Sequence, residues 1–148
     1  VHPDYVWHDM AQAWQTPEVG EQVVAAMTGA SRADRLAMFE SLGMPDSIAE
    51  AHADAVDEAM GACVLALYRS AMPPALPELG ARLQAAARRP ALFVIAEQDP
   101  YVPADLAAST AGDLGGTVVH FADQGHWWMI GNPAAAASSL VDFWSSLD

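Results

Sequence analysis

The spacing of apolar residues changes near residue 72. Before this point, apolar residues recur at intervals of three and four, which is the period of a helix packed along one side. After it, two short and mostly apolar runs stand out, residues 91–96 and 117–121. Such runs, bounded by turn residues, are typical of buried strands. The pattern therefore predicts a helical region over residues 1–72 and a mixed region over residues 73–148.

Capping residues and prolines indicate where the helices of the first region begin and end. Thr16 stands before Pro17, and this order predicts a helix that Thr16 caps and Pro17 opens. Ser31 with Asp34 three residues later resembles a capping box and predicts a second helix start. Gly43 is expected to close that helix. A single long helix is then expected over residues 46–68, because its apolar residues keep one helical spacing throughout.

The second region alternates helices with the two apolar runs. Helices are expected over residues 77–87, 104–114 and 133–147. A strand, a crossover helix and a second strand predict two parallel neighbours in one sheet. Two parallel strands alone do not make a stable sheet, and each would keep one unpaired edge. We therefore expect most of the sheet to be supplied from elsewhere.

Composition and charge exclude several classes of partner. Hydrophobic residues make up 53% of the 148 residues, so a folded core is expected. The net charge is −13, which would repel phosphate backbones and anionic membrane surfaces. No apolar run approaches the roughly 18 residues that cross a bilayer. We therefore expect neither a nucleic acid nor a membrane as a partner.

The single cysteine and the first residues bear on the cellular setting. Cys63 has no partner for an internal disulfide, and its place in an alanine-rich helical stretch predicts a small core residue rather than a nucleophile. The sequence opens at Val1 without an initiator methionine or a secretory signal. These features favour a cytoplasmic location and suggest that another segment precedes Val1.

Two residues that suit acid–base chemistry follow the predicted strands. Asp99 comes shortly after the first strand, and His126 comes shortly after the second. The carboxyl ends of parallel strands meet at one rim of a sheet, so the two side chains should lie close together there. A carboxylate that orients an imidazole makes that imidazole an effective general base. The alternative is structural, with Asp99 capping the helix at residue 104 and His126 packed beside tryptophans.

The residues around this pair resemble the C-terminal part of the α/β-hydrolase family. The stretches that carry the resemblance are Pro90–Asp99, Val102-Pro103, Gly125–Trp127 and Pro133–Trp144. Ala96 departs from the family pattern, which commonly has a glycine before the acid. The resemblance implies that Asp99 and His126 are the acid and the histidine of a catalytic triad, following the last two strands of the core. It also implies an α/β fold of which this chain holds only a part.

The helical region resembles the cap that covers the active site in this family. The resemblance implies a cap over residues 1–72, followed by a βαβα piece of the core over residues 73–148. Aromatic residues in both regions are candidates for the wall of an apolar substrate pocket. These candidates are Trp127 and Trp128 beside the histidine, and Trp7 and Trp14 in the cap. Ordinary packing between helices is the alternative for each.

The nucleophile of a triad is not evident in these residues. Family members carry it on a Gly-x-Ser-x-Gly turn between a strand and a helix, and residues 29–33 are the only local resemblance. Ser31 read as a helix N-cap explains the same residues without an elbow. We therefore expect the nucleophile to lie outside this chain.

Other acidic and histidine residues offer weaker alternatives. Asp4 is a second candidate for the triad acid, because some family members carry the acid one strand earlier. Asp123 is expected to cap a loop. His2 and His8 are six residues apart, which does not suit two ligands on one helical face, so no metal site is expected there.

The expected function is esterase- or lipase-like hydrolysis of a small apolar ester or lactone. The resemblance implies no metal and no organic cofactor. It also implies that the chain is inactive unless the missing N-terminal half, or a complementary chain, supplies the rest of the sheet. Three alternatives remain: an epoxide hydrolase or dehalogenase with an aspartate nucleophile, a non-catalytic ligand-binding or assembly protein, and an all-helical interaction domain with a βαβ end.

Overall fold

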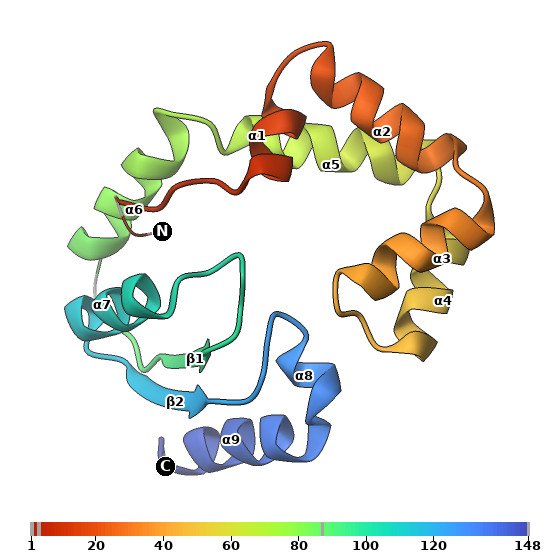
Figure 1. The fold of residues 1–148 in the computed structure, drawn as a ribbon. Helices are drawn as coiled ribbons and strands as arrows, with labels where there is room; N and C mark the ends of the chain where they lie inside the picture. The colour runs from red at the N-terminus through yellow and green to blue at the C-terminus, as the bar shows by residue number, and fades with distance from the viewer. Residues whose placement is uncertain (1, 3, 87, 148) are drawn as a thin grey trace. The chain divides into compact units, whose positions relative to one another are not determined.

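The computed structural model describes residues 2, 4–86 and 88–147. Contacts between residues divide the chain into two compact units. One unit holds residues 6–76, and the other joins the described residues up to Tyr5 to those from Pro77 onward. Figure 1 shows the course of the chain through both units.

The unit of residues 6–76 is built from helices. They are α1 (Asp9–Gln15), α2 (Val19–Gly29), α3 (Arg32–Ser41), α4 (Asp46–Ala55) and α5 (Glu58–Ser70). Helices α1, α2 and α5 pack against one another, and α3 packs on α4, the next helix along the chain. The helical character expected for this region is confirmed. Its role as a cap stays a prediction.

The expected long helix over residues 46–68 is wrong, because the chain leaves the helical conformation at Val56 and Asp57. Asp57 is extended, with φ −140° and ψ 179°, and its carboxylate accepts the N–H of Met60 at 2.7 Å. An aspartate at this position satisfies the first turn of α5 and so competes with a continuous helix. The break also buries Val56, which is 6% exposed.

The expected helix start at Thr16 is also wrong. Thr16 instead closes α1, because its N–H and its hydroxyl both donate to the carbonyl of Gln12, at 3.1 and 2.8 Å. Helix α2 starts three residues later, after Glu18, whose backbone has a positive φ of 67°. The hydroxyl of Thr16 therefore serves the end of one helix rather than the beginning of the next.

Small residues let the helices of this unit approach closely. A Cβ atom on Gly61 in α5 would lie 2.3 Å from Cγ1 of Val24 in α2, so only glycine permits this packing. Ala11, Ala49 and Ala53 are fully buried. The exposed position of Cys63 corrects the expectation of a core residue. Gly61 takes the buried side of α5, and a residue two positions later points to another side of the helix.

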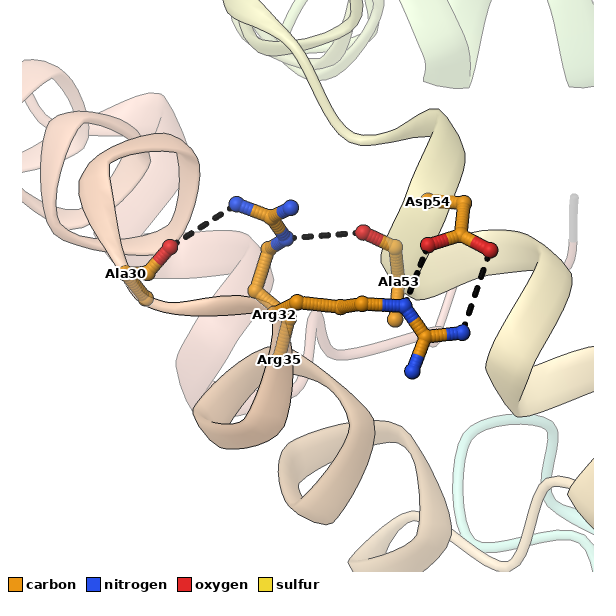
Figure 2. A network of polar contacts seen from close by, with 5 residues as sticks. All are labelled: Ala30, Arg32, Arg35, Ala53 and Asp54. Atoms are coloured by element: carbon orange, nitrogen blue, oxygen red, sulfur yellow. Dashed lines mark hydrogen bonds and ion pairs between the residues drawn. The ribbon is translucent and has the colours of Figure 1, made fainter.

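Arginine side chains join three helix ends in the same unit (Figure 2). The guanidinium of Arg35 donates to the carbonyl of Ala53 at 2.8 Å and to that of Ala30 at 2.8 Å. These carbonyls lie at the ends of α4 and α2, where a cation is favourable. Arg32 makes a two-point ion pair with Asp54 beside it. Arg35 is half-buried, whereas Arg32 and Asp54 are exposed.

The second unit contains a parallel pair of strands with helices around it. Its elements are most of α6 (Ala75–Ala85), β1 (Leu92–Ala96), α7 (Ala104–Leu114), β2 (Thr117–Phe121), α8 (Trp128–Gly131) and α9 (Pro133–Ser145). The strands pair in parallel from Leu92 opposite Thr117 to Ala96 opposite Phe121. Helix α7 connects them and packs on both. The expected strand, crossover helix and strand are confirmed, whereas α8 was not expected.

The two strands differ in burial. Ile95 and Ala96 of β1 are buried, whereas Val118 on β2 is 38% exposed. Within the described residues, β1 pairs with β2 alone, so its other edge carries no strand. The fold is thus α/β in character with a two-stranded sheet among the described residues, and the complete α/β-hydrolase fold stays a prediction.

Candidate active site

Hydrogen bonds hold the two loops that follow the strands side by side. The N–H of Glu97 donates to the carbonyl of Phe121 at 3.1 Å, and the N–H of Gln98 donates to that of Gln124 at 3.0 Å. A Cβ atom on Gly125 would lie 3.3 Å from the carbonyl oxygen of Gln98, so the two backbones are nearly in contact. The ladder of the sheet therefore continues past the strand ends and fixes the distance between the loops.

Asp99 has both carboxylate oxygens engaged. Its Oδ1 accepts the backbone N–H of Tyr101 at 2.8 Å and that of Val102 at 3.2 Å. Its Oδ2 lies 3.0 Å from Nδ1 of His126. The side chain is only 10% exposed, so water competes little for these contacts. The loop therefore presents one oxygen of Asp99 to the histidine in a fixed direction.

His126 lies just before α8, and its Nδ1 atom is the one that contacts Oδ2 of Asp99. A carboxylate on Nδ1 favours the tautomer in which Nδ1 carries the proton and Nε2 keeps its lone pair. No hydrogen bond to Nε2 is found within the described part of the chain. The side chain is 40% exposed, so Nε2 is available to a reacting group. The sequence prediction that Asp99 and His126 lie together is thus met by the geometry, while their catalytic roles stay predictions.

A cavity of about 250 Å³ lies beside the pair. Asp99 and His126 line it together with apolar side chains, and three consecutive residues of β1 also contribute, Val94, Ile95 and Ala96. Ala107 of α7 also lines it, as do Trp127 and Trp128 after β2. The cavity is therefore bordered by β1, by α7 and by the loops that follow both strands.

The tryptophans that were candidates for a pocket wall fall into two groups. Trp127 and Trp128 line the cavity together with His126, and the ring of Trp128 also stacks on Phe121 at 5.5 Å. Trp7 and Trp14 pack within the helical unit on Tyr68, with ring centroids 5.6 and 4.6 Å away. A pocket role for Trp7 and Trp14 stays a prediction.

The remaining candidates for the triad have other partners. The hydroxyl of Ser31 accepts the N–H of Asp34 at 3.2 Å and donates to its carboxylate at 2.7 Å, so the N-cap interpretation is confirmed. Helix α2, rather than a strand, precedes Ser31, which does not fit a nucleophile elbow. Asp4 lies 3.8 Å from Nδ1 of His2 and is 82% exposed. Asp99, and not Asp4, therefore faces His126.

Two kinds of functional element are absent from the described residues. Within residues 2, 4–86 and 88–147, no three side chains of the metal-ligating types gather into a site. None of the helices described there combines the length and apolar character needed to cross a bilayer.

The structure shows two features near the pair that sequence reasoning missed. Oε1 of Glu97 lies 3.0 Å from Nδ1 of His120, which makes a second histidine–carboxylate pair, and both side chains are about half exposed. The sequence did hold a signal for this second pair: Glu97 directly follows β1, and His120 lies near the end of β2. The ring of Tyr101 contacts His126, and this contact depends on loop conformation.

An acid after one parallel strand and a histidine after the next are features of the α/β-hydrolases. The model of the family described as TAP-like protein matches residues 51–144, which include both strands, Asp99 and His126. The chain therefore belongs to this family of α/β-hydrolases. Comparisons with curated proteins and with solved structures found no match.

Proposed function

We propose that Asp99 and His126 are the acid and the base of a hydrolase triad whose nucleophile lies outside these 148 residues. The observation that carries the proposal is the 3.0 Å contact between Oδ2 of Asp99 and Nδ1 of His126. Membership of an α/β-hydrolase family supports it. So does the absence of serine and cysteine among the described residues that line the cavity.

In this proposal His126 moves the proton during hydrolysis. Nδ1–H donates to Asp99, so the lone pair of Nε2 takes the proton from the nucleophile as it attacks the carbonyl carbon. The same proton is then given to the leaving group. Asp99 keeps its charge and stabilises the imidazolium that forms. The two amides on Oδ1 stop the carboxylate from rotating away.

The substrate is a small apolar ester or lactone. The walls of the cavity beside the pair are apolar apart from Asp99 and His126, and Trp127 and Trp128 contribute large flat surfaces. Such walls favour an uncharged acyl or alkyl group, since burying a charge there would cost free energy without a compensating partner. The net charge of −13 further disfavours anionic substrates.

The open edge of β1 is the place where the rest of the sheet joins. A strand edge presents unpaired N–H and C=O groups, and another strand satisfies them. The N-terminal half of the protein, or a complementary chain, supplies that strand and brings the nucleophile to the cavity. The chain by itself is then inactive. A cytoplasmic location is also part of the proposal, since Cys63 is a free thiol.

The test uses the intact protein and p-nitrophenyl esters of increasing acyl length. His126→Ala is expected to lower kcat by at least about 10³-fold, because the base is lost. His120→Ala is the matched control, since it removes a histidine from the exposed pair with Glu97, and it should keep wild-type turnover. Full turnover in His126→Ala would contradict the proposal. Labelling by a fluorophosphonate would assign a serine nucleophile, and turnover of an epoxide or haloalkane without labelling would assign an aspartate.

A further inference from the structure

Tyr101 contacts both members of the pair. Its backbone N–H donates to Oδ1 of Asp99 at 2.8 Å, and its ring meets the ring of His126 with the centroids 4.9 Å apart. The two ring planes are nearly perpendicular, at 83°. Perpendicular contact is a favoured arrangement of aromatic rings. One residue of the acid loop thus supports the carboxylate through its backbone and the imidazole through its side chain.

The hydrogen bond from His126 to Asp99 leaves one motion of the imidazole uncontrolled. It fixes the position of Nδ1, but small changes in the two side-chain torsions can still tilt the ring plane about the line from Nδ1 to Oδ2, which would turn the lone pair of Nε2 away from its target. Rings on either loop can block that rotation. Trp127 also meets His126, at 5.2 Å and 82°, but it is the next residue and moves with the same backbone. Tyr101 belongs to the other loop, the one that carries Asp99. Its contact with His126 therefore fixes the orientation of the imidazole relative to Asp99.

The backbone of Tyr101 is itself held on both sides. Its N–H is engaged by Asp99, and its carbonyl accepts the hydroxyl of Tyr5 at 3.1 Å. Its side chain is half-buried. Because its backbone is fixed in this way, the ring of Tyr101 has a defined position and can restrain the orientation of the imidazole that it contacts.

We infer that Tyr101 is a positioning residue that holds the imidazole of His126 with Nε2 directed at the nucleophile. The inference rests on the proposed function of the Asp99–His126 pair. The aromatic ring is the part of Tyr101 that acts, because the ring makes the contact with His126. Its effect is on the chemical step rather than on substrate affinity, since a misdirected base slows proton transfer after the substrate has bound.

The kinetic test compares three variants of Tyr101 in the intact protein with p-nitrophenyl butyrate. Tyr101→Phe keeps the ring and should stay within about twofold of wild-type kcat. Tyr101→Leu and Tyr101→Ala should lower kcat by roughly 10- to 100-fold, with KM changed by less than about twofold. Unchanged kcat in Tyr101→Ala would overturn the inference, and so would a loss in Tyr101→Phe as large as that in Tyr101→Ala.

A measurement that needs no turnover keeps the inference testable. The Nδ1–H of His126 should give a downfield proton resonance in the NMR spectrum, because Asp99 and Tyr101 protect this proton from exchange with water. Tyr101→Leu should broaden it or speed its exchange, and Tyr101→Phe should not. An unchanged resonance in Tyr101→Leu would overturn the inference. His126→Ala, assayed alongside, separates the two claims: if it keeps full turnover the proposed function fails, whereas if it alone loses turnover only the role of Tyr101 fails.

Discussion

Asp99 is the residue at which the smallest chemical change should have the largest effect. Asn in its place can still accept the amides of Tyr101 and Val102 on its oxygen, so the loop should keep its shape. The Nδ2 group would then face Nδ1 of His126 and donate to it. Nδ1 would have to become an acceptor, which moves the proton to Nε2 and removes the general base.

We therefore expect Asp99→Asn to lower kcat by roughly 10³- to 10⁴-fold while the melting temperature changes little. Glu97→Gln is the matched control, because it neutralises the carboxylate of the neighbouring exposed pair with His120. Steady-state kinetics of both variants on one ester make the comparison. Equal losses in the two variants would mean that the effect is not specific to the Asp99–His126 pair.

Glu21 offers a prediction on pH at the same scale. A hydrogen-bonded pairing with Arg69 lowers the pKa of its carboxyl from 4.5 to about 2. Because the folded pKa is the lower one, the pair stabilises the fold fully above pH 4.5 and loses its contribution as the pH falls toward 2. Both side chains are partly exposed, so salt screens the pair.

Urea unfolding of the wild type and of Glu21→Gln checks this expectation. The wild type should be the more stable above about pH 5, and the difference should shrink at lower pH and in about 1 M NaCl. A difference that stays constant from pH 7 down to about pH 2.5 would show that the charge of Glu21 does not contribute.

Among the contacts that join helices, those of Arg35 should contribute more to the stability of the fold than those of its exposed neighbour Arg32. Its guanidinium satisfies carbonyls at the ends of α2 and α4 from within α3, so three helices depend on one side chain. Arg35→Ala leaves those carbonyls without their charged donor and should cost about 2 kcal/mol of unfolding free energy. Arg32→Ala, one turn away, removes only the exposed pair with Asp54 and should cost less. Chemical denaturation of the two variants compares them, and an equal loss would contradict the difference in burial.

The sequence predicted the elements where pattern and local chemistry agree. Two apolar runs followed by an acid and a histidine were enough to predict the strands and the meeting of Asp99 with His126, because parallel strands end at one rim. The break at Asp57 was missed because the apolar spacing continues across it, and the cap acts through one hydrogen bond. Tyr101 was missed because its contact with His126 depends on the path of a loop.

At the scale of the whole molecule, apolar residues remain exposed on the second unit. Val141 and Trp144, three residues apart on α9, are 54% and 58% exposed, and Val118 on β2 is 38% exposed. Among the described residues, β1 also has one edge that no strand covers. Unpaired strand edges and exposed apolar groups together favour association with another chain.

The 148-residue chain, purified by itself, is therefore expected to self-associate more strongly as its concentration rises, despite its net charge of −13. Sedimentation velocity over a range of concentrations measures this, and the double variant Val141→Gln/Trp144→Gln should shift the distribution toward monomer because it removes apolar surface without changing charge. Under the proposed function, adding the polypeptide that supplies the missing strands should do the same for the wild type and should restore ester hydrolysis. A monodisperse species of 15.7 kDa at every concentration would mean that the exposed edge and helix need no partner. That result would contradict the proposal that the missing strands join at the open edge of β1.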